Sequence, residues 1–149
     1  MENKGRTSLD MSEDEILIMA DKIRQNQIES KEFERRLESY LNNRGEVTEP
    51  IPIGKTPNAL VISGADGKLN VIINPSTIKK CMSDSAARYH GHGLTADIMK
   101  RLPDELRNPV MIFKGAHQNS LVAVTALKDK KKDVIIVAVD LNVRSVWCD

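Results

Sequence analysis

The chain has 149 residues, of which 40% are hydrophobic and 3% aromatic, and its formal net charge is +1. A chain of this length is expected to fold as one domain with one core, built here from aliphatic side chains and methionine. The low aromatic content argues against a nucleic-acid surface of stacked rings, and the small net charge excludes a global basic field. Local clusters of lysine and arginine stay open as partner sites.

The two cysteines, Cys81 and Cys148, do not form a C-x-x-C pair, and no secretory apolar segment precedes them. No apolar run reaches the roughly 18 residues that suggest a membrane span. We therefore expect two free thiols, no membrane contact and a location in the cytoplasm of a host cell.

Two helices are predicted in the segment 1–45. Ser12 and Glu15 have the spacing of a capping box, and apolar residues follow at helical intervals. Ser30 is a candidate cap for a second helix, and Gly45 is its expected C-terminal stop. We expect these helices to act as a tether or to contact a protein partner.

Residues 46–57 carry Pro50, Pro52 and Pro57 and predict an extended connector, because proline does not continue a helix. The expected organisation is an N-terminal arm with two helices over 1–45, this connector, and an α+β unit over 58–149. Packing of all three into one domain is the alternative.

The next segment predicts a β-hairpin. The apolar runs 60–63 and 68–74 flank Asp66-Gly67, a pair typical of tight hairpin turns.

Two helices are predicted after this hairpin. Asn74 and Pro75 form a cap and first-turn pair, opening a helix to about residue 82 or as far as 88. Thr95 is the expected cap of a short helix that Pro103 ends.

The C-terminal part is rich in β-branched residues and predicts an antiparallel meander, with a last strand beginning within 144–148. Its first three strands are expected in the runs 110–113, 120–127 and 134–142. Val122 and Val124 should share a face of this sheet, which we expect to be the core face. The fold class predicted is α+β, with N-terminal helices followed by an antiparallel β-sheet.

Histidine offers three alternatives. His90, His92 and His117 suggest a zinc site, but no carboxylate or thiol is evident beside them, so a metal site is disfavoured. A general base at His92 is better motivated, because imidazole exchanges protons near neutral pH and Gly91 and Gly93 leave it accessible. A polar residue at a turn is the third alternative.

Two further motifs concern phosphate. The tripeptide GKT at 54–56 resembles part of a phosphate loop, but the upstream glycine is missing and Pro57 blocks the helix that would bind phosphate. The run KDKKKD at 128–133 is expected at a hairpin tip. Its lysines there are either a solvated loop or contacts to a nucleic-acid backbone.

A longer pattern resembles a known family. It combines H-x-L-T at 92–95, LP at 102–103, an NP-initiated apolar strand at 108–113 and two long strands. About residues 50–147 resemble the nuclease-like domains of the barnase/EndoU/colicin/RelE-like group in phages and mobile elements. The most similar pattern is the domain at the C-terminus of phage MuF-type head proteins and of large polyvalent phage proteins.

This resemblance implies a phage- or plasmid-borne effector that cleaves RNA without a metal ion or other cofactor, on a fold whose antiparallel sheet is curved. RNA or a host ribonucleoprotein is the implied partner. By position, the family's histidine corresponds to His92, its lysine to Lys79 or Lys80, and its late Ser-aliphatic-Tyr element to residues 145–147, where Trp147 replaces the tyrosine.

Metal-free cleavage of RNA needs a base, an acid and cations beside the phosphate. We take His92, Lys80 and Ser145 as the candidate catalytic residues, with Thr125 as another hydroxyl donor. The candidate RNA- or phosphate-binding residues are Lys79, Arg88, Lys130 and Lys131.

Trp147 lacks the phenolic hydroxyl, so the sequence supplies no clear second acid–base group and cleavage is in doubt. The alternative function is a non-catalytic binding protein that inhibits a host nucleic-acid defence machine, as an anti-CRISPR protein does.

Overall fold

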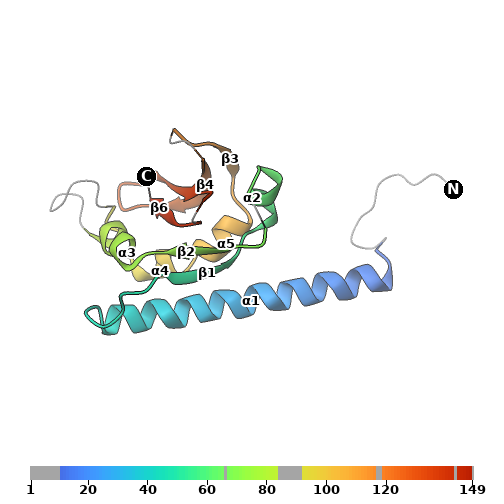
Figure 1. Cartoon of the computed structure of the whole chain (residues 1–149), viewed down its shortest axis with the longest axis horizontal. Helices are drawn as coiled ribbons and strands as arrows, with labels where there is room; N and C mark the ends of the chain where they lie inside the picture. Colours follow the sequence, from blue (N-terminus) through green and yellow to red (C-terminus); the bar gives the residue numbers. More distant parts are fainter. Residues whose placement is uncertain (1–10, 66, 84–91, 117–118, 143, 149) are drawn as a thin grey trace.

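The computed structural model describes residues 11–65, 67–83, 92–116, 119–142 and 144–148 (Figure 1). After a long N-terminal helix, the described residues form a two-stranded sheet, four short helices and a four-stranded antiparallel sheet, which confirms the α+β class. The elements are α1 (Glu13–Asn42), β1 (Ile51–Lys55), α2 (Asn58–Ile62), β2 (Asn70–Ile73), α3 (Pro75–Met82), α4 (Ala96–Met99), α5 (Leu102–Arg107), β3 (Met111–Lys114), β4 (Ser120–Lys128), β5 (Val134–Asp140) and β6 (Val146–Cys148).

One helix, α1, replaces the two helices expected in the first 45 residues. Ser12 caps it as predicted, its hydroxyl accepting a hydrogen bond from Glu15 N at 3.2 Å. Ser30 does not begin a second helix, because the chain contains no glycine or proline between residues 13 and 42 to interrupt the first. Its hydroxyl instead accepts a bond from Arg107 Nη1 at 2.7 Å, which ties α1 to α5.

The C-terminal half of α1 packs on the body of the molecule through Phe33, Leu37 and Tyr40, all buried. Figure 1 shows its N-terminal half extending past the body. The expected connector contains the paired strand β1, whose Ile51 and Ile53 are buried in the same core cluster. The division at 46–57 stays a prediction about separability, and this shared core favours the one-domain alternative.

The prediction of a hairpin around residue 66 is wrong. Residues 60–62 belong to helix α2, and β2 pairs with β1 rather than with the run 60–63. After Pro57, one helical turn buries Leu60 and leaves Ile62 86% exposed. The short apolar run therefore contributes Leu60 to the core and does not form one face of a strand. Asp66 lies outside the described residues.

The helix starts at Asn74 and Thr95 were predicted correctly, but the helix end at Pro103 was not. Asn74 is the N-cap of α3, and the suggested extension of this helix to residue 88 lies outside the described residues. Thr95 caps α4, accepting a bond from Ile98 N at 3.3 Å. Pro103 does not end a helix: it lies in the first turn of α5, where its missing N–H costs no helical hydrogen bond.

The strands β3 to β6 form the predicted antiparallel meander. Val122 and Val124 share a face, opposite Phe113 and Met111, but this face points away from the core cluster. The core face carries the alternate residues of β4, among them Ala123. Neighbouring residues of a strand point to opposite faces, so the sheet was predicted correctly and its orientation was not.

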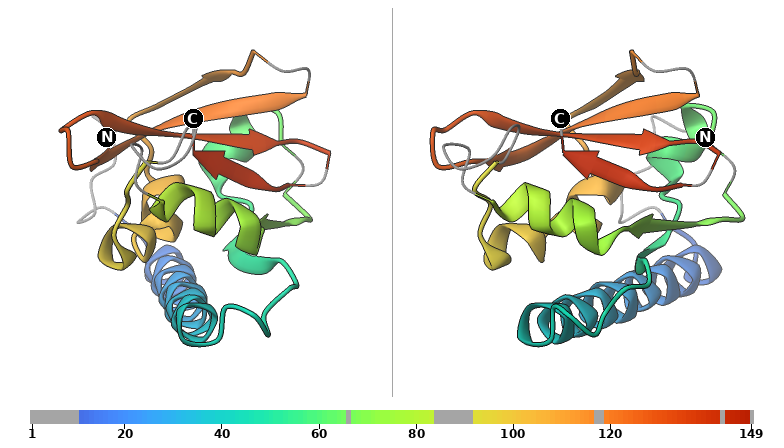
Figure 2. Two further views of the ribbon diagram at one scale, coloured as in Figure 1. Left: turned by 90° about the vertical axis from the view of Figure 1, so that its left-hand side faces the viewer. Right: turned by 60° about the vertical axis from the view of Figure 1, so that its left-hand side comes forward.

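The two sheets meet at the start of β6. Ile72 N donates to Arg144 O at 3.0 Å, and Ile72 forms a parallel bridge with Ser145. Arg144 is fully buried and has a φ of 58°, so the chain turns sharply before it enters β6. Figure 2 shows β6 at the side of the sheet that faces β2 and α3. Within the described ranges, no helix is both long and apolar enough to span a membrane.

Candidate functional site at His92

His92 begins a short strap that leads from α3 to α4. Gly93 N donates to Ser83 O at 2.6 Å and Leu94 N donates to Cys81 O at 3.0 Å, so the strap follows the C-terminal end of α3. Gly93 has a φ of 60°, a left-handed conformation that glycine adopts without strain. Leu94 is buried and anchors the strap in the core.

The imidazole of His92 is half-buried, and its Nε2 lies 3.3 Å from the carbonyl oxygen of Cys148 at the end of β6. A carbonyl oxygen only accepts, so this contact selects the tautomer that carries its proton on Nε2. In the neutral ring the lone pair then belongs to Nδ1. The backbone of β6 thus orients the ring, and in this tautomer Nδ1 is its accepting nitrogen.

A lysine from another part of the chain reaches this strap. A Cβ added at Gly93 would lie 4.0 Å from Lys130 Cδ, so the lysine stem passes beside the strap. Lys130 belongs to the turn between β4 and β5, which Asp129 holds by accepting bonds from Lys131 N at 2.8 Å and Asp133 N at 2.9 Å. This lysine-rich run is therefore the predicted hairpin tip, and its fold brings the stem of one lysine to Gly93, next to His92.

The last turn of α3 carries the exposed side chains of Lys79 and Lys80. The thiol of Cys148 donates to the sulfur of Cys81, which lowers the pKa of Cys81 and raises the pKa of Cys148. The nearby ammonium of Lys80 favours the thiolate form of both groups, so it adds to the first shift and opposes the second. These thiols are buried and not joined in a disulfide. Lys80 therefore lies near the end of β6 that holds His92.

We call this group, formed by His92, Gly93, Lys80, Lys130 and the Cys148 carbonyl, the His92 corner. It joins four elements that are distant in sequence. Two exposed lysines from separate elements lie near the strap and the end of β6 that hold this imidazole. Cations placed near one surface favour an anion there.

Ser145 does not belong to the His92 corner. It lies three residues before Cys148, roughly 10 Å away along an extended chain. Its carbonyl accepts a bond from Asp140 N at 2.8 Å. The other candidate hydroxyl, Thr125, is buried and donates to Ile135 O at 2.7 Å. Lys80 and Lys130 thus lie on elements next to the strap and the end of β6, whereas both hydroxyls are separate from His92.

The remaining candidates have different outcomes. Lys79 and Lys131 are exposed beside Lys80 and Lys130. Arg88, His90 and His117 lie outside the described residues. Among the residues that the structure describes, no group of three or more His, Cys, Asp or Glu side chains is arranged to hold a metal ion.

The GKT tripeptide lies elsewhere, at the edge of a hollow of about 660 Å³ beside α1. Thr56 Oγ1 donates to Leu69 O at 2.7 Å, and Pro57 leads into the five-residue helix α2. The hydroxyl is engaged and the helix is short, so these residues do not have the arrangement of a phosphate loop.

The sequence could not indicate the Cys148 carbonyl, because a backbone group has no residue-type signature. The contact between Lys130 and Gly93 depends on the tertiary arrangement in the same way. The glycine beside His92 was the available signal, since Gly93 has a left-handed φ of 60° that favours glycine.

Residues 83–146 match the family described as the Phage MuF-C-terminal domain. The matched segment begins at the end of α3, includes the strap and the hairpin tip, and ends in β6. It covers less than half of the chain and supports a phage-related domain in this part. No curated protein and no solved structure matches the chain.

Proposed function

We propose that this chain is a phage-borne, nuclease-like protein that binds RNA at the His92 corner and cleaves it without a metal ion. The observation that carries the proposal is the imidazole whose Nε2 lies 3.3 Å from the Cys148 carbonyl, with the Lys130 stem beside the neighbouring Gly93. The similarity of residues 83–146 to a phage domain supports a phage origin. The expected place of action is the cytoplasm of the host cell.

The chemistry assigns one role to each group. His92 Nδ1 accepts the proton of an RNA 2′-hydroxyl, and the freed oxygen attacks the adjacent phosphorus. Lys130 and Lys80 stabilise the charge that develops on the non-bridging oxygens. The P–O5′ bond breaks to give a 2′,3′-cyclic phosphate and a 5′-hydroxyl, whose proton comes from water. Because Ser145 lies at the other end of β6, no protein acid is assigned and slow cleavage is expected.

Incubation of the full chain with single-stranded RNA in EDTA tests this proposal. We expect slow cleavage that leaves cyclic phosphate ends, and a loss of about 10²–10⁴-fold in rate for His92→Ala. The variant should stay folded, since one lost hydrogen bond costs about 0.5–1.5 kcal/mol. Lys114→Ala, an exposed lysine on β3, serves as the control and should cleave at the rate of the unaltered chain.

Cleavage that persists in His92→Ala, or that appears only with added Mg²⁺, contradicts the base role of His92. Thermal melting of each variant separates loss of chemistry from loss of folding.

A second candidate function is favoured by the separation of Ser145 from His92. Without an acid, the same surface can bind RNA or a host ribonucleoprotein and block it, as an inhibitor of a nucleic-acid defence machine. The unaltered chain would then bind RNA in EDTA without cutting it, and Lys130→Ala would weaken this binding.

A further inference from the structure

The N-terminal half of α1 exposes large apolar side chains. Ile16, Met19 and Ile23 are 50%, 51% and 52% exposed, and Leu17, Ile18 and Ile28 are more exposed still. This part of the helix extends past the body (Figure 1). Isolated apolar residues are normal on a surface, but a cluster at one end of a helix indicates an interaction surface.

Three of these residues, together with Ala20, form an apolar stripe along α1. At 3.6 residues per turn, Ile16, Met19, Ala20 and Ile23 fall within about 100° of the helix circumference. The stripe is turned by about a quarter of a revolution from the face that buries Phe33. Its residues are about half exposed, so the described body leaves the stripe open to another surface.

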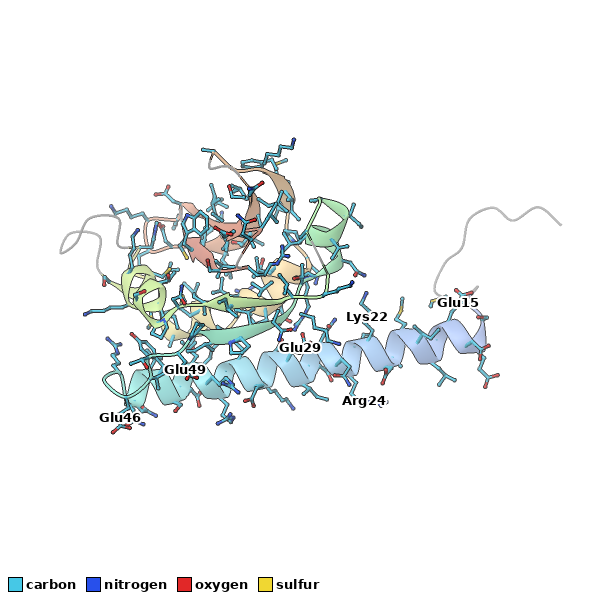
Figure 3. The ribbon with its side chains drawn as sticks, in the orientation of Figure 1. Glu15, Lys22, Arg24, Glu29, Glu46 and Glu49 are labelled. Atoms are coloured by element: carbon cyan, nitrogen blue, oxygen red, sulfur yellow. The ribbon has the colours of Figure 1, made fainter. Side chains whose placement is uncertain are left out.

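Charged residues flank this stripe in a repeated order. Glu15 and Lys22 lie on one flank, two turns apart, and Glu13 and Arg24 lie on the other, about three turns apart. Figure 3 shows Lys22 and Arg24 projecting from opposite sides of α1. Each flank thus has its acidic residue near the start of the helix and its basic residue further along.

The two flanks share one midpoint. Glu15 and Lys22 are equally distant from the point between residues 18 and 19, and so are Glu13 and Arg24. An antiparallel copy of the same helix, centred there, sets acid against base on both flanks. Such self-complementarity is the requirement of a two-fold symmetric interface.

We propose that α1 pairs with α1 of a second copy of this chain, antiparallel over residues 13–24. Met19 of each copy lies next to the two-fold axis, and Ile16 packs beside Ile23 of the second copy. Glu15 faces Lys22 and Glu13 faces Arg24 across the interface. Arg24 also lies 3.6 Å from Asp21 on its own helix, and Glu15 has an interaction within its own chain, so in the dimer both residues would exchange or share partners.

The arrangement leaves room for both bodies. Twelve paired residues span about 18 Å. The body covers the other half of each helix, and the antiparallel direction sets the two bodies at opposite ends of the paired segment. The apolar contact is small, so the dimer is expected to be weak and sensitive to salt.

Sedimentation of the full chain from micromolar to millimolar concentration tests the pairing. We expect a reversible monomer–dimer equilibrium that Ile23→Asp weakens at least tenfold. Ile62→Asp, at an exposed position on α2, is the matched control and should leave the equilibrium unchanged.

A charge exchange tests the register. Glu15→Lys alone should weaken the dimer, because each added lysine faces Lys22 of the second copy. The double variant Glu15→Lys with Lys22→Glu should restore it. A chain that stays monomeric at every concentration overturns the proposal and leaves the stripe to an unrelated partner, and a dimer indifferent to Ile23→Asp or not restored by the double variant overturns it too.

Discussion

The two ends of strand β6 differ in what they do. At its start, Ser145 and the buried Arg144 are bonded to β2 and join the two sheets through backbone hydrogen bonds. At its end, three residues later, the carbonyl of Cys148 meets the side chain of His92 near exposed lysines. The backbone at the start of β6 thus joins the two sheets, and the backbone at its end holds the side chain of His92.

The largest expected effect concerns the fixed end. Ile73 of β2 is fully buried beside this junction, and Ile73→Ala should lower the free energy of unfolding by about 2–5 kcal/mol through the cavity it creates. Chemical denaturation measures this change. Ile62→Ala, at the 86% exposed position, should stay within about 0.5 kcal/mol of the unaltered chain. Equal effects of the two substitutions would show that the junction is not part of the core.

Ser145→Ala tests whether the two ends of β6 act separately in RNA cleavage. The Ser145 side chain lies away from the His92 corner, so its loss should change the rate of RNA cleavage less than tenfold, a difference below about 1.4 kcal/mol. Rate measurements beside His92→Ala decide the point. If both variants lose activity equally, the two ends of β6 act as one site.

The smallest expected effect is on binding at the His92 corner. Lys130→Ala removes one contact to phosphate, which should weaken RNA binding at every sequence and reduce the slope of log K against log salt by about 0.7. A titration at several salt concentrations gives this slope. Lys114→Ala is the matched control, and an equal reduction in both variants would mean that RNA binds without preference for the corner.

The sequence predicted those features that depend on a few neighbouring residues. Ser12 and Thr95 were identified as helix caps because a cap is a contact between a residue and the next turn of its own helix. Asn74 was also placed correctly before α3, although its side chain makes no cap bond. The β-branched runs gave the meander for a similar reason. The tip at 128–133 followed from the strands on either side.

Features that depend on distant contacts could not be predicted. The orientation of Val124 depends on which face of the sheet the helices cover, and the helix at Leu60 depends on a core that other segments build. Ser30 has a side chain typical of a helix cap. It lies inside α1 instead, because no glycine or proline interrupts this helix, and its hydroxyl accepts a bond from Arg107.

The candidate site follows the same division. Glycines around His92 and the lysine run were visible in the sequence. Their meeting was not, because it requires the turn between β4 and β5 to reach the strap after α3. Ser145 was grouped with His92 through the resemblance, and the length of β6 separates the two.

The tautomer of His92 is the most direct test of whether the Cys148 carbonyl fixes the imidazole for contact with RNA. Long-range proton–nitrogen NMR of the imidazole, recorded with and without a short single-stranded RNA, distinguishes a protonated Nε2 from a protonated Nδ1. We expect a proton on Nε2, bonded to the Cys148 carbonyl, and an Nδ1 signal that shifts when RNA is added. A proton on Nδ1 together with a ring indifferent to RNA would contradict it.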